Sequence, residues 1–220
     1  MDSISEIIFI TGLVLLLVVA TISIITLVIS FKKENRICCI GGGVVLALVS
    51  SILGFFALSG SFILDEEFSE ILTLITMIIL FIFAIFASIF TLLSVIKKKE
   101  FCCLGGGISL AGIGYGASIT FIASGSSGSE EFVITLLILW VIILLTVSIT
   151  ALLVILLSLK KRQSLCCFAG AIALAGVVLG FGAFTLVIDE LFGVTTLITN
   201  ILLLVLSGVF VPLVNKSINN

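Results

Sequence analysis

Seven long apolar stretches fill almost the whole chain, and only short charged segments separate them. A transmembrane helix needs about 20 mainly apolar residues, and each stretch reaches that length. Apolar residues make up 61% of the chain and charged residues only 10%, whereas about 25% of a soluble domain is charged. Lipid is therefore the solvent for which this sequence is suited. The predicted spans are 7–31, 37–64, 68–96, 101–124, 132–159, 165–188 and 191–214.

The apolar stretches are continuous rather than alternating, which favours helices over the strands of a barrel. The predicted fold class is all-α: a polytopic membrane protein with seven transmembrane helices in a single transmembrane domain, residues 1–220. None of the connections is long enough to form a separate domain. Such short connections also make consecutive helices antiparallel neighbours.

Three adjacent cysteine pairs recur at intervals of 64 residues. Each pair follows a basic segment and opens a glycine-rich stretch, which reads CCIGGG, CCLGGG and then CCFAGA. The pattern predicts three tandem two-helix repeats of about 64 residues, at 32–96, 97–159 and 160–220, preceded by an extra N-terminal helix at 1–31. Because each repeat holds an even number of helices, all copies share one orientation in the membrane.

The charges predict how the chain is oriented. The ten basic residues lie in alternate connections and at the C-terminal end, and most acidic residues lie in the other connections, such as Asp65-Glu66-Glu67. The positive-inside rule places the basic connections in the cytoplasm. We therefore expect the N-terminus outside and the C-terminus inside, in a multi-pass protein of the plasma membrane.

Small residues follow one face of the second, fourth and sixth spans at helical spacing, and the last two carry a second stripe offset by two residues. Small residues let helix backbones approach closely, which stabilises helix packing in lipid. We expect these three helices to form an inner layer, with spans 68–96 and 132–159 facing lipid. The predicted packing residues are Gly43, Ala47, Gly54, Gly107, Ala111, Gly112, Gly114, Gly116, Ala171, Ala175, Gly176, Gly180 and Gly182.

The cysteine pairs are candidate lipidation or thiol sites. They lie at helix N-termini near Lys or Arg, where thiolate is favoured, so S-acylation, thiolate metal binding and redox activity are all open, beside a plain packing role. Adjacent cysteines lack zinc-ribbon spacing and the chain has no histidine, so no metal or cofactor is predicted. Disulfides are not expected in a reducing cytoplasm. The candidates are Cys38, Cys39, Cys102, Cys103, Cys166 and Cys167.

The basic connections are candidate contacts for anionic lipid headgroups, because they combine cations with the free N–H groups of helix N-termini. The positive-inside rule alone also accounts for them. The residues concerned are Lys32, Lys33, Arg36, Lys97, Lys98, Lys99, Lys160, Lys161 and Arg162.

Asn200 is the one strongly polar residue near a predicted helix centre, and Thr196 shares its face. Asn200 is interpreted as the partner of an interhelical hydrogen bond. Binding of a polar substrate group and the lining of a narrow pore are the alternatives.

Functional classes follow from what lies inside the membrane. With no histidine and no carboxylate near a helix centre, no catalytic residue is predicted, since acid–base and nucleophilic chemistry need a base within reach. The favoured function is a structural or accessory membrane protein that acts through helix–helix and lipid contacts. The alternative is a channel or carrier for a small neutral or lipidic solute, lined by serines and threonines of the second and fourth spans. Expected partners are membrane lipids, other membrane proteins or a second copy, and not nucleic acid.

Overall fold

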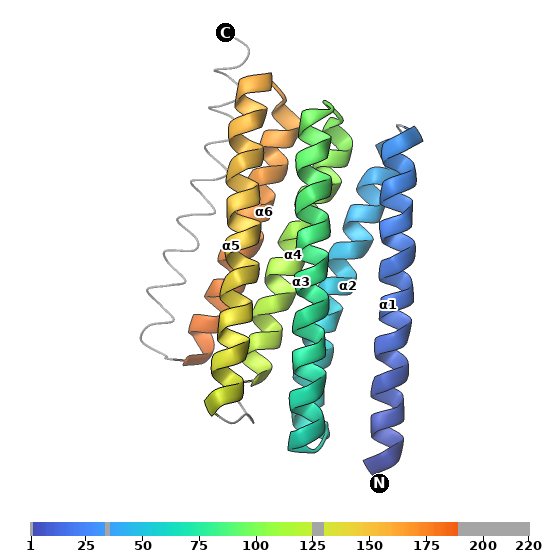
Figure 1. Ribbon diagram of the computed structural model, residues 1–220, viewed down its shortest axis with the longest axis vertical. Coiled ribbons are helices and arrows are strands. Elements are labelled where there is room, and N and C mark those ends of the chain that lie inside the picture. The colour runs from blue at the N-terminus through green and yellow to red at the C-terminus, as the bar shows by residue number, and fades with distance from the viewer. Residues whose placement is uncertain (1, 34–35, 125–129, 189–220) are drawn as a thin grey trace.

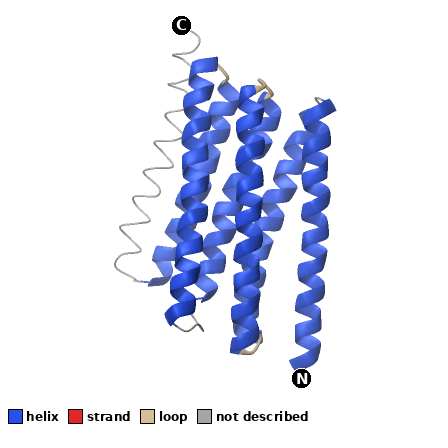
Figure 2. Cartoon of the chain, in the orientation of Figure 1, coloured by secondary structure: helices blue, strands red, loops and turns tan. Residues whose placement is uncertain are grey.

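The computed structural model describes residues 2–33, 36–124 and 130–188. Every regular element in these ranges is an α-helix, as Figure 2 shows. The helices are α1 (Asp2–Lys33), α2 (Arg36–Ile63), α3 (Glu66–Ile96), α4 (Glu100–Ser124), α5 (Glu130–Lys161) and α6 (Ser164–Ile188). The all-α prediction is confirmed for these residues, and each of the first six predicted spans coincides with one helix.

Five of these helices are long and apolar enough to cross a membrane. Their apolar spans are Phe9–Lys33, Ile37–Ile63, Glu67–Ile96, Glu100–Ala123 and Glu131–Lys161, and α6 adds a shorter one, Ser164–Gly180. Such lengths and compositions are those of a multi-pass membrane protein. The predicted seventh span, with Thr196 and Asn200, lies outside the described residues.

The helices form two layers (Figure 1). α2, α4 and α6 lie side by side in one layer, and α1, α3 and α5 lie in the other. α4 is the central helix, because it packs against α2 and α6 within its layer and against α3 and α5 across it. The three glycine-rich helices therefore pack together as predicted.

The expectation that span 68–96 faces lipid fits only one side of α3. Phe83 and Phe90 are buried, and the exposed side of α3 is formed by isoleucines such as Ile82 and Ile89. Phe90 packs against Phe31 of α1, with ring centroids 5.5 Å apart. The large rings belong to the buried core, whereas the isoleucines remain to contact acyl chains.

Two turns share one backbone motif. Lys98 and Arg162 adopt positive φ angles of 58° and 56°. The N–H groups of Lys98 and Lys99 donate to the carbonyls of Val95 and Ser94, and the turn at Arg162 repeats both bonds. This is the Schellman motif, which ends a helix and satisfies its last carbonyls. It ends α3 and α5 sharply, so that α4 and α6 begin at once in the opposite direction.

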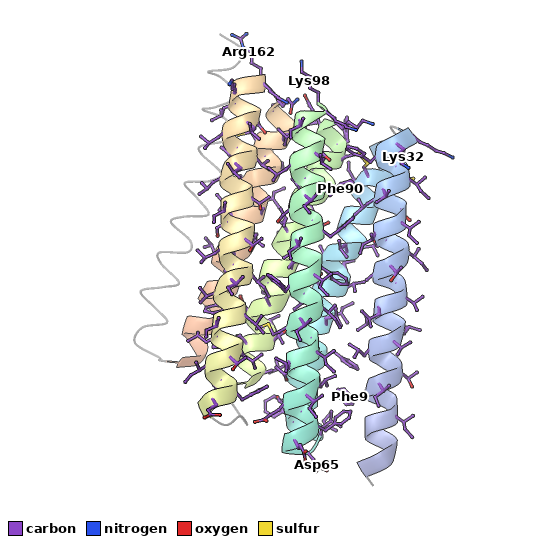
Figure 3. All side chains as sticks on the ribbon, viewed as in Figure 1. Phe9, Lys32, Asp65, Phe90, Lys98 and Arg162 are labelled. Atoms are coloured by element: carbon purple, nitrogen blue, oxygen red, sulfur yellow. A yellow bond between two sulfur atoms is a disulfide. The ribbon has the colours of Figure 1, made fainter. Side chains whose placement is uncertain are left out.

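Charges separate to the two ends of the bundle (Figure 3). Lys32, Lys98 and Arg162 lie at one end, called the basic end, and Asp65 lies at the other. α2, α4 and α6 all begin at the basic end, so they run parallel and bring the three cysteine pairs to one level.

Backbone meets backbone between α2 and α4. A β-carbon at Gly43 would lie 2.2 Å from the carbonyl oxygen of Gly105, and one at Gly112 would lie 2.4 Å from the Cα of Ala47. Real β-carbons do not come this close to other atoms, so only glycine fits at these positions. The absence of side chains is what lets the two helices touch.

The same packing joins α4 to α6. A β-carbon at Gly107 would lie 2.4 Å from the carbonyl oxygen of Ala169, and one at Gly176 would lie 2.4 Å from the Cα of Ala111. Ala171 and Ala175 are half-buried, and Gly182 lies within α6, in a part whose side-chain surroundings the structure does not describe. Predicted small residues at the two interfaces are Gly43, Ala47, Gly54, Gly107, Ala111, Gly112, Gly114, Gly116, Gly176 and Gly180.

Candidate functional site: a row of cysteines at the basic end

The six cysteines form a row across the first turns of α2, α4 and α6, here called the cysteine row. Two of them, Cys39 of α2 and Cys102 of α4, are joined by a disulfide with a Cα–Cα distance of 4.8 Å. That separation lies within the range a disulfide requires. The contact of Gly43 with Gly105, one turn deeper, is what brings the two backbones this close.

The expectation that no disulfide forms is therefore wrong for Cys39 and Cys102. The argument from a reducing cytoplasm considered only the compartment and not access to the bond. Cys39 is completely buried and Cys102 nearly so. Thiol–disulfide exchange needs an attacking thiolate to reach a sulfur atom, and polar reductants are kept from this one by packed helices and lipid.

A second cysteine contact joins α4 to α6. Cys103 and Cys166 lie together at this interface, in one buried cluster, and both are fully buried and free. They belong to a small apolar cluster with Val95, Val154 and Ala169. This pair thus has reduced sulfur atoms held next to each other in a dry environment.

The two ends of the row differ in exposure. Cys38 is half-buried on α2, while Cys167 is buried on α6, and both are free. A sulfur atom must be reachable and unbonded to accept an acyl group, so Cys38 is the member of the row best placed for S-acylation. Within the described residues, no group of three or more Cys, Asp or Glu side chains stands close enough together to hold a metal ion.

Two lysines at the basic end bind helix carbonyls. The Nζ of Lys161 donates to the carbonyl oxygens of Ile96 (2.9 Å) and Val95 (3.3 Å), and the Nζ of Lys99 donates to that of Phe31. These are C-terminal carbonyls of α3 and α1, where the helix dipole attracts a cation. Sequence reasoning assigned both lysines to topology or lipid and missed this capping role.

The other candidate headgroup contacts are more open. The exposed cations of the basic end are Lys32, Lys33, Lys97, Lys98, Lys160 and Arg162. The side chain of Arg36 lies outside the described residues. Eight of the nine predicted cations are thus located either on the surface or near a helix end, and none of these eight lies in the apolar interior.

The hydroxyl groups expected to line a pore all bond within their own helices. Ser50 and Ser51 donate to the carbonyls of Leu46 and Ala47. The same pattern holds for Ser59, Ser61, Ser118 and Thr120. Their donors are therefore used before any solute arrives, which leaves no ordered set of hydroxyl donors at these positions.

Two buried polar residues, Trp140 and Gln163, were not predicted to have a role. The Nε1–H of Trp140 in α5 donates to the Oγ of Ser118 in α4 at 3.1 Å, so Trp140 links the layers. Gln163 is buried beside the cysteine row, and within the described residues its amide has no hydrogen-bond partner. The polar residue types gave a weak signal here, because only the fold shows which ones become buried.

Comparisons with family models, curated proteins and solved structures find no match for this chain.

Proposed function

We propose that this protein is a structural or accessory subunit of the membrane, which acts through helix–helix contacts and lipid contacts within the bilayer. The observation that carries the proposal is the backbone-to-backbone packing of α4 with both α2 and α6. At Gly43, Gly107, Gly112 and Gly176, a β-carbon would lie only 2.2–2.4 Å from backbone atoms of the neighbouring helix. The helices therefore leave no path between them at those levels. The hydroxyls expected to line a pore, which bond within their own helices, support the same conclusion.

The proposal includes three parallel two-helix repeats after an extra N-terminal helix. Its support is a set of contacts that recur 64 positions further along the chain. Gly43 meets Gly105, and Gly107 meets Ala169 in the same way. The turns at Lys98 and Arg162 are also 64 positions apart and share one backbone motif. A repeat built this way buries one continuous layer of small residues.

The proposed membrane is the plasma membrane, with the basic end in the cytoplasm. Anionic headgroups are the proposed partners of the exposed lysines and of Arg162, since a cation near an anionic leaflet contributes about 1 kcal/mol of binding. A membrane-impermeant maleimide tests this orientation. Added to intact cells, it is expected to label Asp65→Cys but neither Lys98→Cys nor Arg162→Cys, and the reverse is expected in inside-out vesicles.

Wild-type protein serves as the background control for that experiment, because its own half-buried Cys38 lies at the basic end. Labelling of Lys98→Cys and Arg162→Cys from opposite sides of the membrane would refute both the orientation and the parallel repeats.

The functional class is tested by native purification together with reconstitution. In mild detergent, the protein is expected to run with a stoichiometric partner or as a defined oligomer of itself. In proteoliposomes, uptake of small neutral solutes is expected to equal that of protein-free vesicles. Saturable solute flux by a protein that purifies as a lone monomer would overturn the proposal in favour of a carrier.

A further inference from the structure

The Cys39–Cys102 bond and the Cys103–Cys166 contact occupy equivalent places on their helices. Each joins the second cysteine of one pair to the first cysteine of the next, and in each case the two residues are 63 positions apart. Each also lies one turn from a backbone contact between its two parallel helices. The free thiols are therefore held side by side much as the bonded sulfurs are.

One residue differs between the two places. A β-carbon at Gly105 of α4 would lie 2.3 Å from the carbonyl oxygen of Cys39, so α2 and α4 meet closely only because Gly105 has none. The residue at the corresponding position of α6 is Ala169, which is fully buried. Ala169 belongs to the same buried cluster as Cys103, and it carries a methyl group where Gly105, at the equivalent position beside Cys39, has none.

The spacing of the helices agrees with this difference. The β-carbon position of Gly43 lies 2.2 Å from the carbonyl oxygen of Gly105, and that of Gly107 lies 2.4 Å from the carbonyl oxygen of Ala169. Deeper in the bundle the same difference recurs, because a β-carbon at Gly116 would lie 2.2 Å from the carbonyl oxygen of Ser50, whereas one at Gly180 would lie 3.0 Å from that of Gly114. α6 thus stands slightly further from α4 than α2 does, and the second cysteine pair is in contact but unbonded.

We propose that Cys103 and Cys166 are a redox-active dithiol that closes to a second interhelical disulfide when it meets an apolar, low-molecular-weight disulfide. One cysteine, as its thiolate, attacks the oxidant and forms a mixed disulfide, and one thiol leaves. The other cysteine then attacks the mixed disulfide and releases the second thiol. Two electrons and two protons pass from the cysteines to the oxidant, which becomes two thiols. Closure ties α2, α4 and α6 into one covalent layer.

The surroundings of the pair select the kind of oxidant. Both thiols lie among apolar side chains, including Val95 and Val154, and neither is exposed. A charged disulfide has no favourable route to them, whereas an uncharged one dissolves in lipid and reaches them as the helix ends open locally. In general, the rate at which a buried cysteine reacts depends on how readily the reagent reaches its sulfur atom.

The test uses full-length protein in detergent with Cys38→Ser and Cys167→Ser, which leaves the Cys39–Cys102 disulfide and the proposed dithiol. Uncharged dithiodipyridine is the oxidant, and the released thiopyridone is followed by absorbance. Two equivalents per chain are expected, with the loss of two hydrogen atoms by intact mass and no pyridyl adduct. Non-reducing tryptic mapping is expected to join the peptides that contain Cys103 and Cys166.

Two further variants separate the proposal from simple thiol reactivity. Cys103→Ser is expected to release one equivalent and to retain a stable pyridyl adduct on Cys166, because no second thiol can resolve it. Ala169→Gly, which removes the methyl group between α4 and α6, is expected to speed closure several-fold. Stable adducts on both cysteines of the parent protein, or no reaction until the protein is denatured, would overturn the proposal.

Discussion

Gly43→Ala is expected to lower the melting temperature of the detergent-solubilised protein by several degrees, while Gly41→Ala leaves it unchanged or slightly higher. The two glycines lie in the same turn of α2 and differ in what surrounds them. A β-carbon at Gly43 would lie 2.2 Å from the carbonyl oxygen of Gly105, whereas nothing lies within 4 Å of the same position at Gly41.

The physical reason is that the obstacle at Gly43 is backbone. A side chain could rotate out of the way, but the carbonyl of Gly105 belongs to a hydrogen-bonded helix, so α2 and α4 must separate. Overpacking of this kind costs about 1–3 kcal/mol. Alanine at Gly41 carries no such cost, and it favours helix over glycine by up to about 1 kcal/mol. The same substitution therefore acts in opposite directions two residues apart.

Thermal unfolding followed by near-UV circular dichroism, with both variants in the same detergent, measures the difference. The Gly41→Ala variant controls for the change in helix propensity, because both substitutions add one methyl group to the same helix. Equal melting temperatures for the two variants would show that the α2–α4 contact contributes little to stability, and the structural proposal would lose its main support.

The small-residue stripes could be read from sequence because lipid leaves few other ways to pack helices. Where no water drives apolar groups together, close backbone approach is the main source of contact, and glycine at helical spacing marks it. Gly43 and Gly107 are positions of this kind. The pairing of stripes between neighbouring helices could not be predicted in the same way, because several registers bring small residues together.

The Cys39–Cys102 disulfide was not predicted because the sequence alone did not show which stripes pack together. The two stripes of the fourth span are offset by two residues, so pairing the first stripe of α2 with the second stripe of α4 sets Gly43 against Gly105. In two parallel helices, that register places Cys39 next to Cys102. The offset of the stripes therefore carried a signal for the disulfide, which the stripes or the cysteines taken separately do not give.

The inward position of the α3 phenylalanines had no sequence signal of its own. In a soluble protein, polarity separates the buried face from the exposed face, but in lipid both faces are apolar and hydropathy cannot separate them. Phe83 and Phe90 are buried and Ile82 and Ile89 are exposed, although all four are apolar. Which side turns inward depends on the partners available, such as Phe31 for Phe90, and only the folded structure gives those.

Loss of the Cys39–Cys102 disulfide is expected to be the most destabilising change that leaves the helix contacts intact. A disulfide typically contributes about 2–4 kcal/mol because it restrains the unfolded chain. Here it holds α2 against α4 between two residues that are 63 positions apart in the chain. The double variant Cys39→Ala with Cys102→Ala is expected to melt several degrees below the wild type. A membrane-permeant reductant is expected to lower the melting temperature of the wild type and not that of the double variant.

Limited trypsin digestion gives an independent readout, because Lys97 and Lys98 are exposed between the two bonded cysteines. On a non-reducing gel, the fragments that contain Cys39 and Cys102 are expected to migrate together, and on a reducing gel they are expected to separate. Cys38→Ala is the matched control, since it changes a free cysteine next to the bond and should behave as the wild type in both assays. Fragments that separate without reductant would show that α2 and α4 are not covalently joined, and the register of the cysteine row would then have to be redrawn.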